Sequence, residues 1–397
     1  MILQLNPVWT LVVALLAIEL GKRINSAVFW LERGNIPPAV TAGLLISLAL
    51  AVLRGNGWVD VRLDTGPRDV LLLVFFASLG FGAHLRQLAS AGKGALVICV
   101  GVALVVVAQN LVGVTVAKVF GAIPALGLFL GSAAFAGGHG TVVAWANTTY
   151  TAGLTGAFEL GIGGATLGLV LGGVVAGPVA VWLATRDRSA ARRATVFEDD
   201  GLTGPEREPA FSTDRWLPSL LWIALALALA PRLGESAAAQ GLKVPAFLAV
   251  LLICVALTNI ADIVKRPLDT DVTDLIGTLA LRIFLAIAML SLDWVALMEH
   301  IPMLLTAAVA QALVTVAIAV FLVYNLFGRD REGAAATGGF IGFCLGAMPV
   351  GLAVMRRLNT RFGDTPRALL AITLAASLFT DTANALIITT FFRLLGN

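Results

Sequence analysis

The sequence predicts an all-α polytopic membrane protein with about ten transmembrane helices, built from two inverted five-helix repeats that each carry a glycine-rich re-entrant hairpin. Apolar residues make up 58% of the 397 residues and charged residues only 13%, and the mean hydropathy is +0.92. This composition excludes an ordinary soluble protein. A series of ten apolar runs and a similarity between the two halves of the chain complete the prediction.

The ten apolar runs are bounded by charged residues or by proline and glycine, and each is a candidate transmembrane helix. They lie at 8–21, 37–53, 69–83, 95–120, 157–184, 216–232, 244–263, 274–292, 301–327 and 367–395. Several are shorter than the roughly 20 residues that a perpendicular helix needs, so we expect them to be extended by their flanks or buried among neighbours. The first run has neither a basic segment before it nor a small-x-small cleavage site after it, which predicts a retained helix.

The only long polar run, residues 185–215, divides the chain into a repeat at 1–184 and a repeat at 216–397. Five spans in each repeat place the second copy upside down relative to the first. This is the inverted-repeat plan of secondary transporters.

Two matches support the repeat. VAQNLVGV at 107–114 and VAQALVTV at 309–316 are offset by 202 residues, and Gly137–Gly138 pairs with Gly338–Gly339 at nearly the same offset.

The positions of the basic residues predict the orientation. With the segment 185–215 taken as cytoplasmic, 19 Lys and Arg residues lie inside and seven outside, while Arg282 lies within a span. Cytoplasmic loops carry the excess of Lys and Arg. We therefore expect the N- and C-termini outside and the linker 185–215 in the cytoplasm.

Two stretches rich in glycine, 123–146 and 333–357, predict the re-entrant hairpins. Glycine inside a helix costs about 1 kcal/mol relative to alanine, and bare backbone in hydrocarbon costs several more. We expect the first to enter from outside, the second from inside, and their tips to meet near the bilayer midplane. Half-helix N-termini would attract a carboxylate there, and freed carbonyls a cation. The alternative is that glycines only allow close packing, which we favour for LGLVLGGVVAGP at 167–178.

FAGGHGTVVAW at 135–145 places His139 among three glycines. An ionisable group at membrane depth is a candidate for function, although the adjacent backbone amides are candidates as well. We predict that His139 neighbours a binding site. Proton coupling through His139 or Glu159 is the alternative.

The last span contains a buried carboxylate, Asp381. It lies some fourteen residues past Arg367, about 20 Å along a helix, which is too deep to snorkel. Asn384 follows at i+3 and Ser377 precedes at i−4, so the three side chains share one helical face. With Thr380 and, at the outer start of the fifth span, Glu159, these are the candidate Na⁺ ligands. The alternative is an Asp that hydrogen-bonds a neighbouring helix.

The sequence has no G-x-S-x-G, H-E-x-x-H or Walker motif and no basic-aromatic pattern. We therefore predict no enzyme, no organic cofactor and no nucleic acid as a partner. Among the basic residues Arg356, Arg357 and Arg361, which count towards the inner charge, one is a candidate clamp for a substrate carboxylate, and we take Arg356. A channel or sensor is the alternative from another class.

Four segments resemble the bacterial sodium/glutamate symporters. They are AGGHGTVVAW (136–145), ATLGLVLGGVVAGPVA (165–180), GFCLGAMPVGLAVMRRLNTRFG (342–363) and TDTANALIITTFF (380–392), and the resemblance extends from IPPAVTAGLL (36–45) to the C-terminus. It implies a homodimer in the lipid of a bacterial inner membrane that carries L-glutamate inward with Na⁺ by an elevator-like movement. The family is similar in plan to the citrate symporters, so another di- or tricarboxylate is the alternative substrate.

The resemblance also implies substrate-binding residues. The first motif maps onto Gly137, Gly138, His139, Gly140 and Thr141, and the second onto Gly339, Gly342, Gly346 and Pro349. Phe340, Cys344 and Met348 depart from the pattern, where we expect a polar residue, a glycine and a threonine.

Overall fold

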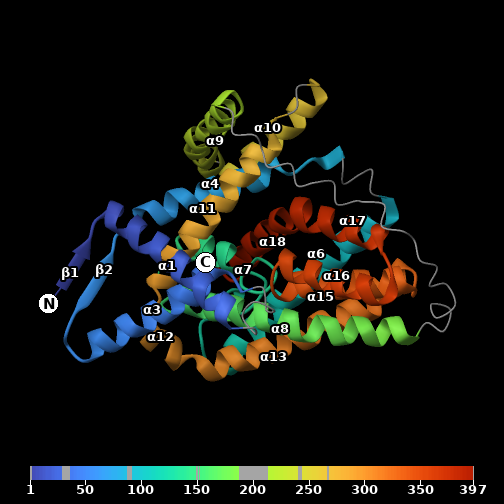
Figure 1. Ribbon diagram of the computed structural model, residues 1–397, viewed down its shortest axis with the longest axis horizontal. Coiled ribbons are helices and arrows are strands. Elements are labelled where there is room, and N and C mark those ends of the chain that lie inside the picture. Colours follow the sequence, from blue (N-terminus) through green and yellow to red (C-terminus); the bar gives the residue numbers. More distant parts are fainter. Residues whose placement is uncertain are drawn as a thin grey trace.

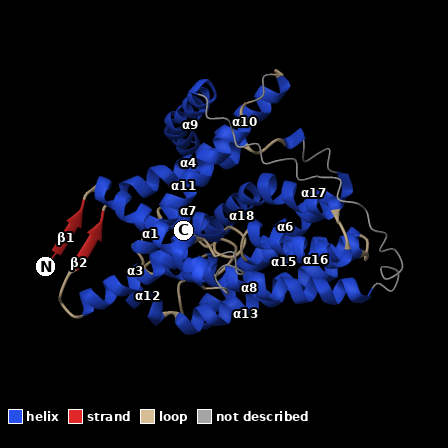
Figure 2. Ribbon diagram, viewed as in Figure 1, coloured by secondary structure: helices blue, strands red, loops and turns tan. Residues whose placement is uncertain are grey.

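The computed structural model describes residues 2–28, 36–86, 92–148, 151, 153–186, 213–239, 244–265 and 268–396. Most of the predicted linker 185–215 lies outside these residues. Helices dominate the fold, and the described strands form one two-stranded ribbon (Figure 2). The prediction of an all-α polytopic membrane protein is thus confirmed at this level.

All ten predicted runs are helical. The first half contains α1 (Pro7–Ala27), α3 (Pro38–Gly55), α4 (Gly66–Phe81), α6 (Gly92–Val119) and α8 (Ala157–Arg186). The second half contains α9 (Thr213–Ala239), α10 (Ala246–Ile263), α11 (Thr270–Leu290) and α13 (Ile301–Ile318), which continues through the π-helical turn η4 (Ala319–Tyr324) into α14 (Asn325–Phe327). The last run comprises α17 (Pro366–Leu374), the π-helical turn η5 (Ala375–Thr380) and α18 (Asp381–Leu394).

Seven of the described helices are long and apolar enough to cross a membrane, or eight if the bent pair α17 and α18 counts as one span. The bend between these two is 48°. Helices α1 and α4 occupy predicted positions but do not meet this measure, and α4 has only 16 residues. The number of about ten spans therefore stays a prediction.

The helices form two groups. In the first, α3 and α1 pack on α11, and α10 and α9 pack on α4, while α4 and α11 pack on each other. In the second, α6 and α13 pack on each other and are joined by the two hairpins, α8 and α17. Figure 1 shows α9 and α10 at the top of the view and α15, α16 and α17 at its right.

Contacts in one half have counterparts in the other. The pair α1–α3 corresponds to α9–α10, the pair α3–α11 to α10–α4, and the pair α6–α17 to α13–α8. Since α4 and α11 occupy equivalent places in the sequence, as do α6 and α13, each group is centred on a pair of matching helices.

The two glycine-rich stretches differ in structure. The first begins with the 3-10 helix η1 (Pro124–Leu128), continues in turns to residue 136 and ends in α7 (Gly138–Ala146). The second is a hairpin of two α-helices, α15 (Arg331–Leu345) and α16 (Met348–Phe362). The first arm stays irregular where it lies directly on the backbone of α6: a Cβ on Gly127 would lie 2.5 Å from the carbonyl oxygen of Gly113.

The predicted pairing of Gly137–Gly138 with Gly338–Gly339 is wrong in position. Gly338 and Gly339 lie inside α15, whereas the chain of the second hairpin reverses at Gly346 and Ala347. A Cβ on Gly338 would lie 2.6 Å from the side chain of Ala180 on α8. These glycines serve close helix packing, and the glycine at the tip of the second hairpin is Gly346.

Two short elements were not predicted. The strand β1 (Ile2–Leu5) pairs in parallel with β2 (Asp60–Leu63), and the ribbon is continued by a hydrogen bond from the Asp64 amide to Thr10 Oγ1, 3.2 Å. Helix α12 (Trp294–Glu299) is capped at its N-terminus by Asp293, whose side chain accepts from two backbone amides of its first turn. The ribbon and α12 both border the same cavity, described below.

Candidate functional site

A row of glycines on α8 forms the surface on which both hairpins pack. A Cβ on Gly161 would lie 2.5 Å from Val142 of the first hairpin. A Cβ on Gly168 would lie 2.1 Å from the carbonyl oxygen of Leu345 in the second. Helix α8 thus passes from one hairpin to the other within two turns, and the packing function predicted for 167–178 is confirmed at Gly168.

The tips of the two hairpins touch. Gly138 has a φ of +69°, a conformation that L side chains rarely adopt. A Cβ added there would lie 3.7 Å from the carbonyl oxygen of Gly346. The structure therefore places the two tips side by side, while their re-entrant character and their meeting near the bilayer midplane stay predictions.

His139 lies at this junction, in the first turn of α7, and is 7% exposed. Its Nε2 lies 3.1 Å from Thr166 Oγ1 on α8. Thr166 Oγ1 also donates to the carbonyl of Ile162 over 2.9 Å. Of the other residues of the first motif, Gly140 lies close to Phe75, since an added Cβ would lie 3.0 Å from its ring, and Thr141 Oγ1 donates to the Gly137 carbonyl over 3.0 Å.

A cluster of oxygens surrounds Ser132 in the first hairpin. Ser132 Oγ lies 2.9 Å from Asn110 Oδ1 on α6 and 2.6 Å from Asn384 Oδ1 on α18. The hydroxyl has one proton, so only one of these two amide oxygens can accept it. Asn384 Nδ2 donates to the Ser132 carbonyl over 3.1 Å. All three side chains are fully buried, and this polar cluster at the base of the tip can hold a small cation with neutral oxygens.

The last span brings only some of its predicted ligands to this cluster. Asn384 reaches Ser132, whereas the π-helical turn η5 and a bend of 48° lie between Ser377 and α18, so a single face shared by Ser377, Asp381 and Asn384 stays a prediction. A π-helical turn adds a residue per turn and rotates the preceding side chains. Ser377 Oγ and Thr380 Oγ1 donate instead to carbonyls of their own helix.

Asp381 begins α18, three residues before Asn384, and so lies on the same side of that helix. Within the described residues its carboxylate has no hydrogen-bond or ion-pair partner. Glu159 has a different setting: its charged neighbours are Asp293 and His300 at the ends of α12. The structure therefore brings Asn384 to the Ser132 cluster and places Glu159 beside α12.

The second motif lines the inside of its hairpin and the tip. A Cβ on Gly339 would lie 2.6 Å from Met355 Sδ, and one on Gly342 would lie 2.7 Å from the backbone of Gly351. Gly346 is buried at the tip, and Pro349 stands in the first turn of α16. Arg356 is exposed further along α16.

Two glutamines at equivalent places in the halves hold the hairpins. Gln109 Nε2 on α6 donates to the carbonyl of Cys344 over 2.9 Å. Gln311 Nε2 on α13 donates to the carbonyls of Leu130 and Gln109, each over 2.8 Å. Each central helix therefore supports the hairpin of the opposite half. The sequence predicts that these glutamines join helices, but not that their partners are hairpin carbonyls.

Sequence reasoning also missed Ser132, Asn110 and Thr166. Asn110 is a polar residue inside an apolar run, next to Gln109, and this is the signal that marks it. Ser132 and Thr166 carry no comparable signal, because single Ser and Thr residues are common in membrane helices, where their hydroxyls bond to their own backbone.

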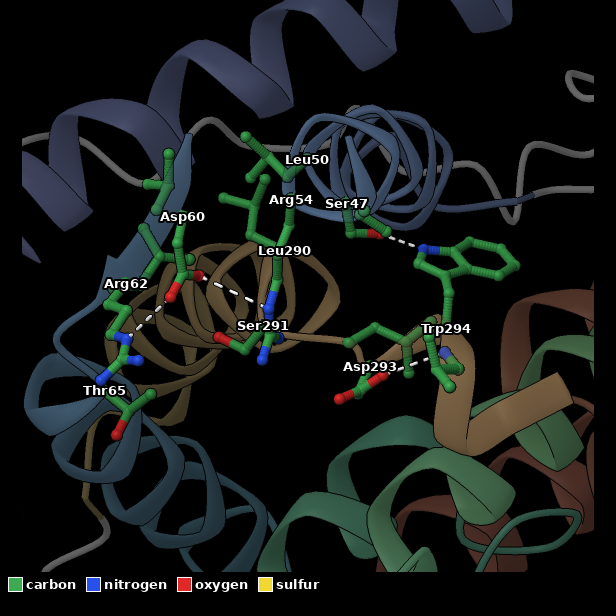
Figure 3. A pocket seen from close by; sticks show the side chains of 16 residues that line it. Ser47, Leu50, Arg54, Asp60, Arg62, Thr65, Leu290, Ser291, Asp293 and Trp294 are labelled. Atoms are coloured by element: carbon green, nitrogen blue, oxygen red, sulfur yellow. Dashed lines mark hydrogen bonds and ion pairs between the residues drawn. The ribbon is translucent and has the colours of Figure 1, made fainter. Parts of the chain in front are cut away.

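The described cavities lie elsewhere. The larger, about 640 Å³, is bordered by α3, β2 and the segment joining α11 to α12. Figure 3 shows Asp60 between Arg54 and Arg62, and Trp294 Nε1 donating to Ser47 Oγ over 3.0 Å. A second cavity, about 320 Å³, separates α4 and α10 from α7. Neither is lined by any predicted site residue.

The fold and the junction define a polytopic membrane protein with two buried hairpins whose tips meet, an arrangement in which transporters hold solutes at broken helices. The family model described as "Sodium/glutamate symporter" matches residues 3–364. The chain belongs to the sodium/glutamate symporter family. It is therefore a transporter and not an enzyme.

Curated relatives agree over nearly the whole length. The sodium/glutamate symporter of Escherichia coli (strain K12) is 32% identical over 402 residues, which cover 98% of each chain. The sodium/glutamate symporter of Haemophilus influenzae is 30% identical over 393 residues, which cover 98% of this chain and 97% of that one.

Proposed function

We propose that the protein is a secondary active transporter that carries L-glutamate into a bacterial cell together with Na⁺. The observation that carries the proposal is the junction of the two hairpin tips beside His139, with the oxygen cluster of Ser132 behind it. The N–H groups of His139 and Gly140 in the first turn of α7, with the tip at Gly346 beside them, would supply a setting for a carboxylate. The names of the relatives agree with this substrate and this ion.

Na⁺ would bind at the Ser132 cluster and be balanced by Asp381. Asn110 Oδ1 accepts from the Ser132 N–H over 3.0 Å, and the Ser132 hydroxyl lies within hydrogen-bond distance of Asn110 Oδ1 and Asn384 Oδ1, so these oxygens keep lone pairs that a cation could use. Oxygen donors are what a hard cation prefers. Asp381, on the same side of α18 as Asn384, would supply the negative charge. We retain Ser377, Thr380 and Glu159 as candidates only if the segment around η5 or α12 rearranges.

The substrate would contact the first motif and the second tip. Gly137, Gly138, His139, Gly140 and Thr141 bring one set of backbone groups, and Gly346 with Pro349 brings the other. Gly339 and Gly342 would act indirectly, by letting α15 and α16 approach closely. Arg356 would act at the inner mouth, since it is exposed on α16.

An elevator-like movement of inverted repeats fits the two groups of helices. The group around α6 and α13 carries both hairpins and the predicted ligands, whereas the group around α4 and α11 carries none of them. The first would move and the second would stay fixed, as one partner of a homodimer in the membrane. Both termini would face outward and the linker inward.

The movement has a direct test. Asn147 at the end of α7 donates to Asp69 on α4 over 3.3 Å, a contact between the two groups. In the double variant Asp69→Cys with Asn147→Cys, a disulfide should block uptake, and reduction should restore it. Each single variant should transport. Undiminished uptake by fully cross-linked protein would refute relative movement at this contact.

The function itself is tested in proteoliposomes. An inward Na⁺ gradient should drive accumulation of labelled L-glutamate, and a K⁺ gradient should not. Asp381→Asn should insert and elute as the parent protein does but lose Na⁺-driven uptake. Accumulation driven by a pH gradient alone would favour proton coupling through His139 or Glu159. Uptake of citrate in place of glutamate would favour the tricarboxylate alternative, and equilibration without accumulation would indicate a channel.

A further inference from the structure

The position of Thr166 relates it to both hairpins. On α8 it stands between Gly164, which packs on Ala134 of the first hairpin, and Gly168, which packs on Leu345 of the second. The bond between Thr166 and His139 therefore lies at the level where α8 passes from one hairpin to the other. A change in the protonation or the tautomer of the His139 ring would therefore alter the hydrogen bonding at the junction of the tips.

The distances at Thr166 favour one arrangement of the protons between Ile162, Thr166 and His139. Thr166 has one hydroxyl proton, and it is donated to the Ile162 carbonyl over 2.9 Å. With the proton donated to that carbonyl, the Thr166 oxygen accepts from His139 Nε2, 3.1 Å away, and the ring is then the Nε2–H tautomer. In a neutral imidazole the other nitrogen, Nδ1, then has a free lone pair. Within the described residues no group donates a hydrogen bond to Nδ1.

We propose that Thr166 fixes His139 as the Nε2–H tautomer so that Nδ1 accepts a hydrogen bond from the ammonium group of an α-amino acid substrate. This inference rests on the proposed function. A carboxylate has no proton to offer Nδ1, and its negative charge repels the lone pair. The Gly138 N–H donates to the Ala134 carbonyl, so the carboxylate is served instead by the next N–H groups of the first turn of α7, those of His139 and Gly140.

The arrangement gives the site a selective property. An α-amino acid carries its ammonium and α-carboxylate on one carbon, and His139 presents an acceptor directly beside the helix N-terminus that attracts the carboxylate. A dicarboxylate without an amine leaves Nδ1 unpaired, and an unpaired buried polar group is costly. The pair Thr166 and His139 therefore selects amino dicarboxylates against amine-free dicarboxylates.

The test compares L-glutamate with glutarate, which lacks the amine, as competitors for labelled L-glutamate uptake in proteoliposomes. In Thr166→Val the KM for L-glutamate should rise about tenfold, which corresponds to about 1.4 kcal/mol. Inhibition by glutarate and the Na⁺ dependence should stay as in the parent. Thr166→Ser, which keeps the hydroxyl, should behave like the parent. His139→Asn, whose amide oxygen takes the place of Nδ1, should retain more preference for glutamate than His139→Leu.

Two results would overturn the inference. The first is an equal change for glutamate and glutarate in Thr166→Val, which would show a general packing function. The second is a ¹⁵N spectrum of the parent protein in which His139, one of three histidines, is the Nδ1–H tautomer or the imidazolium. The spectrum decides the matter even if Thr166→Val fails to fold. A parent protein that lacks Na⁺-driven glutamate uptake refutes the proposed function, whereas a parent that transports glutamate with an unmoved selectivity in Thr166→Val refutes only this inference.

Discussion

Replacing Gln311 by leucine should loosen the first hairpin. Gln311 is fully buried and its Nε2 donates to Leu130 and Gln109 carbonyls over 2.8 Å each. Two hydrogen bonds contribute about 1 kcal/mol each. The Leu130 carbonyl would also become bare, at about 1–3 kcal/mol, because among the described backbone bonds outside regular helices none ends on it.

One contribution to the free energy of unfolding has the opposite sign. Gln311 Oε1 is buried and has no partner within the described residues, so leucine removes an unsatisfied atom. The two desolvation effects roughly offset each other, and the net loss in the free energy of unfolding should be about 2 kcal/mol.

Equilibrium unfolding in mixed micelles measures this loss, and amide hydrogen exchange locates it. Peptides covering 129–137 should exchange faster in Gln311→Leu. Gln109→Leu should instead speed exchange near the second tip, because Gln109 supports Cys344. Gln4→Leu is the matched control: Gln4 is exposed, and its replacement should change stability by less than about 0.5 kcal/mol. If Gln311→Leu is as stable as this control and exchange at 129–137 is unchanged, then Gln311 does not hold the first hairpin in place.

Two further predictions concern packing and pH. Gly168→Ala should destabilise the protein by about 1–3 kcal/mol, because the new Cβ would lie 2.1 Å from the Leu345 carbonyl oxygen. The control Gly173→Ala should be neutral or stabilising, because a Cβ there would have nothing within 4 Å. Thermal unfolding of both variants checks this prediction. Arg215 donates to both carboxylate oxygens of Asp269 and holds the pKa of that carboxyl below its usual range. A pKa that is lower in the folded state stabilises the protein above the unfolded-state pKa, near 4, and this stabilisation is lost as the pH falls through the lowered pKa. Asp269→Asn should therefore lower the free energy of unfolding by about 1 kcal/mol or less at pH 7. When that free energy is measured against pH, it should fall less steeply on the acid side in the variant than in the parent.

The existence of the hairpins could be predicted from glycine alone, but their register could not. Glycine marks any place where a Cβ does not fit, at a tip or between packed helices. Gly338 and Gly339 have the second use and Gly137 and Gly138 the first, so matching the pairs by sequence gave the wrong tip. Where a chain reverses depends on the surfaces that receive it, here α8, and a single sequence does not contain that information.

The break in the last span shows a second limit. Residues 375–380 contain neither proline nor glycine, so no local signal interrupts the helical period used to group Ser377 with Asp381. The π-helical turn is instead consistent with the bonds that hold Asn384 on Ser132, a contact between residues 252 positions apart. A tertiary contact of that kind can override the local pattern, because leaving a buried amide without partners costs about 1–3 kcal/mol.

The same contacts suggest why amides support this junction. Hairpin backbone at membrane depth exposes carbonyls and N–H groups that must be bonded within the protein. Gln109, Gln311, Asn110 and Asn384 bind such groups from three helices and carry no charge. A charged side chain would be expensive to desolvate there and would compete with a charged solute for the tips. Neutral amides can hold the two hairpins together and leave the strong electrostatic interactions at the junction for the ion and the substrate that we propose to bind there.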